Sequence, residues 1–133
     1  AEALRIWGNA GYPRRAVALC DASRRVVGDH GGILPRESAS LLTLPGVGPF
    51  TAAVVRCFGY GEQVSVVDVN VVRVLGRVLL GELEPAASLP PARINDLAKR
   101  MLPPGEAARW NPALMDLGAA VCRARPRCAA HDL

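Results

Sequence analysis

Lysine is nearly missing from this sequence. Lys99 is the only lysine among the 16 basic residues, so arginine supplies almost all of the positive charge behind the net charge of +4. Arginine carries a planar guanidinium that can bind two phosphate oxygens at once, whereas lysine is a point charge. A small excess of arginine is compatible with a nucleic-acid partner, but it does not establish one.

Long apolar runs are also missing. Half of the 133 residues are hydrophobic, yet no run approaches the ~20 residues that a membrane-spanning helix needs. The N-terminal residues lack the long apolar centre of a signal peptide. We therefore expect a cytoplasmic protein with no membrane partner, and the length fits a single domain over residues 1–133.

Paired strands are the third absence, and the chain is predicted to be all-α. Apolar residues recur at helical spacing along most of the sequence. The segment VSVV (64–67) has the composition of a strand but no second strand to pair with, so it is predicted to be an extended connector. We expect six to seven helices. The predicted order is a helix at 13–27, a helical hairpin at 36–60, a helix at 68–80, and C-terminal helices at 90–123. A proline-rich segment at 85–91 is predicted to be a linker.

The same spacing predicts which side chains of two helices face the core. Arginines fall on the opposite face of the first helix, and a polar stripe of Asn70, Arg73 and Arg77 runs along the second. The residues expected to point inward are Leu19, Cys20, Val26 and Val27 in the first helix and Val71, Val74, Leu75 and Val78 in the second.

The hairpin contains the most informative stretch, LPGVGPFTAAVV (44–55). Pro45 ends one helix and Pro49 begins the next, so Gly46, Val47 and Gly48 form the whole turn. Glycine tolerates a positive φ and lets another backbone or a phosphate come close. The first N–H groups of the second helix have no internal acceptors and, with the helix dipole, they favour an anion. The pattern fits a phosphate-binding hairpin or a plain helix–helix turn.

The full motif and three others resemble one family. LLTLPGVGPFTA, VVDVNVVRVLGR, WGNAGYPRRA and WNPALMDLGAAVC occur in the order found in the helix-hairpin-helix DNA glycosylases. That superfamily includes endonuclease III, the A/G-mismatch adenine glycosylases and the thymine-mismatch glycosylases. The resemblance covers almost the whole chain. It implies a base-excision repair enzyme that acts on double-stranded DNA with a mismatched or damaged base and works at the nucleoid, as a monomer.

By this resemblance Asp68 occupies the position of the catalytic aspartate. Cleavage of an N-glycosidic bond develops positive charge on the deoxyribose, and an anion held near C1′ stabilises that charge and can orient a water. The simpler interpretation is that Asp68 only caps its helix, which would contribute about 1 kcal/mol. The hairpin upstream favours catalysis, and the two roles are compatible.

Phe50 bears on the type of reaction. The lyase branch of the family has a lysine here that forms a Schiff base with the sugar. Phenylalanine cannot do so, and we therefore expect a monofunctional glycosylase that leaves the strand uncut. Packing of the Phe50 ring on the core is an equally good interpretation. No residue decides between thymine or uracil opposite guanine and adenine opposite guanine or 8-oxoguanine as the excised base.

The resemblance also implies a set of DNA contacts and shows what the sequence lacks. The candidate contacts are Gly46, Val47, Gly48, Phe50, Thr51, Asn70 and Arg73. Elements that line the base pocket precede this region in the family, among them a glutamate, and Glu37 stands at the wrong place to substitute for it. The alternative to a glycosylase is therefore a catalytically silent DNA-binding module or an inactive fragment.

The tail at 122–133 departs from the family's cluster loop, which has the spacing C-x6-C-x2-C-x5-C. Here Cys122 is followed after five residues by Cys128 and after two more by His131. A [4Fe–4S] cluster needs four thiolates. We therefore expect no cluster and no other cofactor. Zinc on these three residues is an alternative that is one ligand short, and two reduced thiols in a basic tail are favoured.

Overall fold

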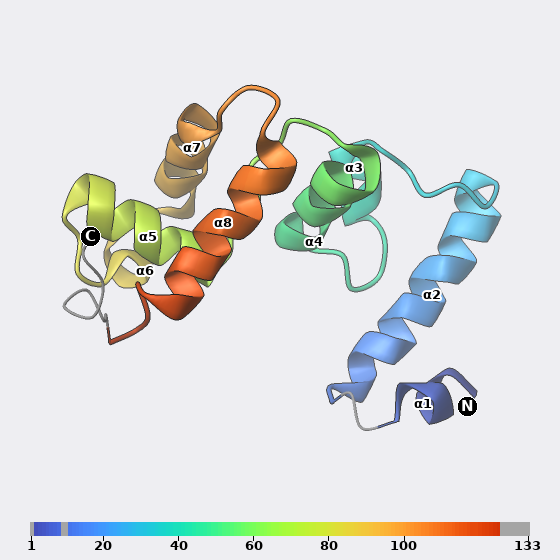
Figure 1. Ribbon diagram of the computed structural model, residues 1–133. Helices are drawn as coiled ribbons and strands as arrows, with labels where there is room; N and C mark the ends of the chain where they lie inside the picture. The colour runs from blue at the N-terminus through green and yellow to red at the C-terminus, as the bar shows by residue number, and fades with distance from the viewer. Residues whose placement is uncertain (1, 9–10, 126–133) are drawn as a thin grey trace. The chain divides into compact units, whose positions relative to one another are not determined.

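The computed structural model describes residues 2–8 and 11–125, and within them every regular element is a helix (Figure 1). The all-α prediction is confirmed. The chain divides into two compact units, Ala1–Ala52 and Ala53–Leu133, and the boundary falls inside the predicted hairpin. No helix in the described ranges is both long enough and apolar enough to cross a membrane.

The first unit contains α1 (Glu2–Trp7), α2 (Pro13–His30), α3 (Ser38–Leu42) and the start of α4 (Pro49–Val54). Pro13 opens α2, as expected for a residue with a fixed φ and no N–H to satisfy. Gly31 ends it with a positive φ of 61°, and its N–H donates to the carbonyl of Val26. The helix is therefore one turn longer than the predicted 13–27.

The prediction of the inward face of α2 is wrong in part. Leu19 and Val27 are 59% and 69% exposed, and the buried positions are Ala16 and Ala22. Small side chains on this face let the rest of the unit approach closely, as the contact between Ala18 and the hairpin shows below. A pattern weighted toward large apolar residues assigns the wrong face when alanines make the contact.

The second unit begins with η1, a π-helical turn (Val55–Gly59) that continues α4 directly. It then contains α5 (Val69–Leu80), α6 (Pro85–Ser88), α7 (Pro91–Met101) and α8 (Ala107–Ala120), and α5 packs on α6, α7 and α8. The described ranges thus hold eight α-helices rather than six or seven. The two additions are α1, which has only six residues, and α6, which replaces the predicted linker because Pro85 can start a helix.

The core of the second unit forms around α5. Val71, Val74 and Leu75 are buried as predicted, and Val71 and Leu75 pack with Ala98 of α7. Val78 was also expected inside but is 70% exposed, because it lies near the end of α5, where it lines an open pocket. The buried positions of α5 therefore lie between Val71 and Gly76, and the candidate catalytic residue, Asp68, caps the start of the helix.

Candidate functional site

The two glycines of the hairpin have different structural roles. Gly46 adopts a positive φ of 76°, and a Cβ built on it would lie 2.7 Å from the Cβ of Ala18 in α2. Gly48 has no such constraint, and a Cβ there would meet no atom within 4 Å. Gly46 is thus required by the fold, whereas Gly48 leaves open space in front of the first turn of α4.

The residues around the turn are only partly buried. Leu41 and Leu44 are buried in the core of the first unit, whereas Val47 is half-buried. Thr51 lines a hollow of about 230 Å³ with Gly46, Val47 and residues of α1 and α2. Phe50 is 45% exposed, so its ring is not committed to the core. The N–H groups that open α4 lack intrahelical acceptors, which makes this end suited to an anion.

Asp68 caps α5, as predicted. Its backbone is extended, with φ −111° and ψ −176°, and one carboxylate oxygen accepts a hydrogen bond of 2.8 Å from the N–H of Val71. The other oxygen accepts from the side-chain amide of Asn70 at 2.6 Å. A carboxylate has about four acceptor sites, so two donors leave capacity for a water or a sugar. The residue is half-buried, and its carboxylate is therefore not sealed in the interior.

Asn70 and Arg73 form a hydrogen-bond chain with Asp68. The Oδ1 of Asn70 accepts from the Arg73 guanidinium at 2.6 Å, and the same guanidinium donates to the carbonyls of Gly118 at 3.1 Å and Cys122 at 2.9 Å. Gly118 lies in the last turn of α8, and Cys122 lies two residues after the helix ends. Arg73 therefore joins α5 to the end of α8 through these hydrogen bonds. Contact of Asn70 and Arg73 with DNA stays a prediction.

One polar side chain near Asp68 was missed by the sequence analysis. Asn111 of α8 is 2% exposed, and its amide binds the backbone of the connector before Asp68. Its neighbours in sequence, Trp110 and Pro112, gave no sign of this role. A polar residue inside an apolar helical period is the signal that could have found it, because a buried amide needs partners.

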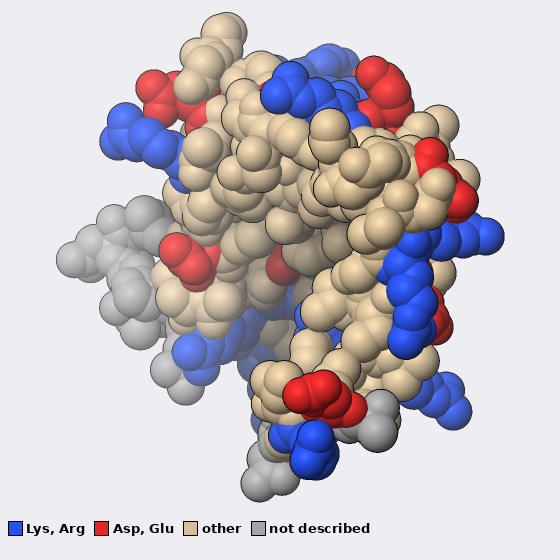
Figure 2. Space-filling view, turned by 90° about the vertical axis from the view of Figure 1, so that its right-hand side faces the viewer, with Lys and Arg blue, Asp and Glu red and all other residues tan. Residues whose placement is uncertain are grey.

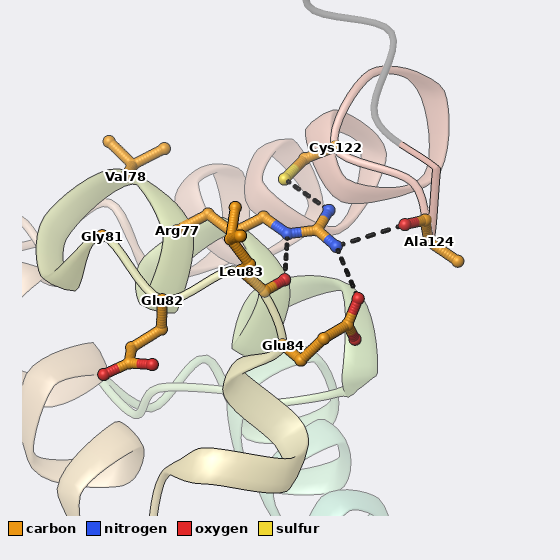
Figure 3. Close-up of a pocket in the computed structure, with 8 residues that line it drawn as sticks. All are labelled: Arg77, Val78, Gly81, Glu82, Leu83, Glu84, Cys122 and Ala124. Carbon is orange, nitrogen blue, oxygen red and sulfur yellow. Dashed lines mark hydrogen bonds and ion pairs between the residues drawn. The ribbon is translucent and has the colours of Figure 1, made fainter.

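Arg77 organises the opposite end of α5 (Figure 3). Its guanidinium donates to the carbonyls of Leu83, Arg123 and Ala124, and it lies 3.6 Å from the sulfur of Cys122. Arg77, Leu83, Cys122 and Ala124 are among the residues that line a pocket of about 470 Å³. Because the guanidinium is engaged on protein groups, the pocket is a structural junction between the end of α5 and the residues after α8.

A metal site is not assembled by the residues that the structure describes. No three His, Cys, Asp or Glu side chains gather within those ranges. Cys122 is buried beside Arg77, and Cys57 accepts a hydrogen bond from Asn111 in a separate part of the same unit. The predictions for Cys128 and His131 lie outside the described residues. A four-thiolate cluster does not fit the described donors, and its absence stays a prediction.

Charge alone does not define a binding face. On the face drawn in Figure 2, Lys and Arg side chains lie in separate groups with acidic side chains among them. Several arginines are also used internally, for example in the ion pair between Arg56 and Glu62 at 2.7 Å. The distribution of charge therefore does not mark out a binding face.

Comparison with known proteins gives the same family from sequence. No family model matches the chain. An adenine DNA glycosylase of Mycolicibacterium smegmatis is 45% identical over 130 residues, which are 96% of this chain and 43% of that protein. The human adenine DNA glycosylase is 37% identical over 96% of this chain and 24% of its own length. A thymine/uracil-DNA glycosylase of Methanothermobacter thermautotrophicus is 38% identical over 86% of this chain and 52% of its own length.

Solved structures of a DNA glycosylase and of endonuclease III also superpose on the chain. A thermostable thymine-DNA glycosylase superposes with a TM-score of 0.84 at 34% identity, over 96% of this chain and 59% of that one. An endonuclease III trapped in a covalent complex with DNA superposes with a TM-score of 0.78 at 24% identity, over 92% of this chain and 56% of that one. At this identity the likeness shows the fold alone. The fold is that of the helix-hairpin-helix enzymes.

Both in sequence and in fold, the chain is similar to the helix-hairpin-helix DNA glycosylases. It spans less than two thirds of the length of the relatives named here.

Proposed function

We propose that the chain acts as a monofunctional DNA N-glycosylase that removes a mismatched base from duplex DNA and works as a monomer. The observation that carries the proposal is the carboxylate of Asp68, which is held by two donors, is only half-buried, and keeps acceptor capacity. A fixed anion of this kind stabilises the positive charge that develops on the deoxyribose. A substrate of this kind would place the protein at the nucleoid.

The reaction consumes one water. The bond between C1′ and the base nitrogen breaks, and its electron pair leaves with the base, which takes up a proton. The water oxygen bonds to C1′ and loses its own proton, which leaves an abasic site. Asp68 stabilises the sugar cation and orients the water. The base must first leave the helical stack, at a cost of a few kcal/mol that is smallest at a mismatch.

The hairpin supplies binding without reading sequence. The open space at Gly48 and the free first-turn N–H groups of α4 favour a phosphate oxygen. The exposed Phe50 ring lies two residues further on. Since Phe50 replaces the lysine of the lyase branch, no Schiff base forms. Borohydride should therefore trap no covalent adduct between this chain and DNA.

Adenine opposite guanine or 8-oxoguanine is the first substrate to test, because the adenine glycosylase of M. smegmatis is 45% identical to the chain and the thymine/uracil enzyme 38%. Duplexes with G·A, 8-oxoG·A, G·T and G·U pairs are incubated with protein, and abasic sites are then cleaved with alkali. We expect product that disappears in Asp68→Asn and persists in the control Asp96→Asn. Asp96 is an exposed carboxylate of α7 paired with Arg100 at 2.8 Å.

A catalytically silent DNA-binding module is the second candidate, and the same experiment decides between the two. Duplex binding without product from any of the four pairs would favour it and refute the glycosylase. Product that survives in Asp68→Asn would also contradict the role proposed for this carboxylate.

A further inference from the structure

Asn111 is the one polar side chain that is fully buried within the part of the chain that the structure describes. Leaving a buried polar group without partners costs about 1–3 kcal/mol. The amide of Asn111 avoids that cost with three hydrogen bonds. Its Oδ1 accepts from the N–H of Val66 at 3.0 Å, and its Nδ2 donates to the carbonyl of Val64 at 2.9 Å and to the sulfur of Cys57 at 3.3 Å. The amide is therefore held on both of its polar ends.

These bonds substitute for a missing strand partner. Val64 and Val66 lie in the extended connector, and among the described residues no strand pairs with it. The amide donates to the carbonyl of Val64 and accepts from the N–H of Val66, two positions on, as a neighbouring strand would. A slip of one residue would present the opposite face of the segment. Asn111 thus fixes the register of the segment that ends two residues after Val66, at Asp68.

The same helix also holds the segment after Asp68. Gly118 lies seven residues beyond Asn111, which places both on one face of α8, two turns apart. A Cβ at Gly118 would lie 2.5 Å from the Cβ of Asn70, so α8 contacts the first turn of α5 there. The position of Asp68 is therefore set from both sides by one face of α8.

The third partner connects this arrangement to η1. Cys57 is buried in a cluster with Val66 and Ala107, and it receives the second hydrogen bond of the Asn111 amide nitrogen. Because η1 continues α4 along the chain, Asn111 joins α8, the connector and the end of the hairpin's second helix. A hydrophobic residue of the same size would fill the space but could not set the register.

We propose that Asn111 is a positioning residue, which holds the connector so that the Asp68 carboxylate stands at the reacting sugar. This rests on the proposed glycosylase function. Asn111 does not touch the substrate, and its effect is confined to the placement of Asp68. A misplacement of about 1 Å at a reacting group can cost about 10²-fold in rate.

The test compares Asn111→Leu and Asn111→Asp with the control Asn95→Leu, which makes the same change at an exposed position of α7. Single-turnover cleavage and duplex affinity are measured below the unfolding temperature of each variant. We expect Asn111→Leu to slow cleavage by about 10²-fold, with affinity unchanged within about twofold and with Asn95→Leu like wild type. Asn111→Asp keeps the size and the acceptor for Val66, so it serves if the leucine variant does not fold. Unchanged cleavage, or equal losses of rate and affinity, would overturn the proposal.

A second measurement does not depend on activity. Hydrogen exchange at the Val66 N–H and the side-chain amide resonances of Asn70 are recorded in wild type and in Asn111→Leu. We expect faster exchange at Val66 and shifted Asn70 resonances, with the amides of α7 unchanged. If wild type yields no product, the proposed function fails and this measurement decides alone: unchanged signals at both residues would refute the positioning role, and changed signals would support it.

Discussion

At the scale of single residues, the structure separates functions that the sequence presents together. Gly46 and Gly48 look equivalent in the string PGVGP, yet only Gly46 has a positive φ and a close neighbour. Asp68 and Asn70 look like ordinary helix-start residues, yet they are joined by a hydrogen bond of 2.6 Å. The chemistry of each position is set by its neighbours in space, and a sequence pattern does not reveal which residues these are.

The two glycines give a paired prediction. Gly46→Ala should destabilise the protein by about 1–3 kcal/mol, because alanine tolerates the positive φ poorly and its Cβ would collide with Ala18. Gly48→Ala should leave the unfolding temperature nearly unchanged, since its Cβ meets nothing.

Gly48→Arg should weaken duplex binding while the protein stays folded, because the side chain fills the space left for a phosphate. Thermal unfolding and binding titrations at fixed salt measure these effects. Affinity of Gly48→Arg equal to that of wild type would mean that the turn is only structural.

At the scale of elements, most helices are predictable and some of their faces are not. The strong period of α5 locates it within one residue, and Asp68 caps it as expected. The helix α6 is missed because a proline-rich segment reads as a linker, although proline is compatible with a first turn. The inward face of α2 is missed because Ala16 and Ala22, rather than its larger residues, are buried there.

The candidate site is predictable to the same extent. Asp68 is predictable because it lies in a motif of the family. Asn111 is not predictable, since its role depends on backbone groups that are 45 and 47 residues away in sequence. Arg73 and Arg77 form a polar stripe in sequence, and only the structure reveals that both are engaged on backbone carbonyls after α5 and α8. Partners distant in sequence are the part that a single sequence cannot give.

The contact of α5 with α8 yields a prediction at this scale. Gly118→Ala should separate the two helices, because the added Cβ would lie 2.5 Å from the side chain of Asn70 and 2.8 Å from its carbonyl oxygen. We expect a loss of stability of about 1–3 kcal/mol, as for other overpacked cores, and a slower cleavage step. Denaturant unfolding and single-turnover assays measure the two effects. The control is Ala119→Ser, at the exposed neighbouring position, and wild-type stability of Gly118→Ala would contradict the contact.

At the scale of the whole molecule, the chain is an arginine-rich helical protein whose candidate functional residues lie in two units. The hairpin turn belongs to the first, and Asp68, Asn70, Arg73 and Asn111 belong to the second. The chain's 16 basic residues include one lysine, and position 50 holds a phenylalanine. Both observations fit the proposed hydrolysis without a covalent intermediate.

The metal content is a prediction for the whole molecule. Of the four cysteines, Cys57 is engaged by Asn111, and Cys122 lies beside Arg77. Because a [4Fe–4S] cluster needs four thiolates, the purified 133-residue chain should be colourless. Iron analysis and absorbance in the visible range check this. Brown protein with about four irons per chain would overturn it, and stoichiometric zinc would favour the alternative with Cys122, Cys128 and His131.

The close approach of the turn to α2 has a consequence for how this sequence can vary. Ala18 and Gly46 are 28 positions apart, yet each occupies the room that the other would need to grow. A bulkier side chain at either position has to wedge the helix away from the bend. We therefore regard the two positions as a single steric pair, in which the side chain at one position limits the side chains that fit at the other.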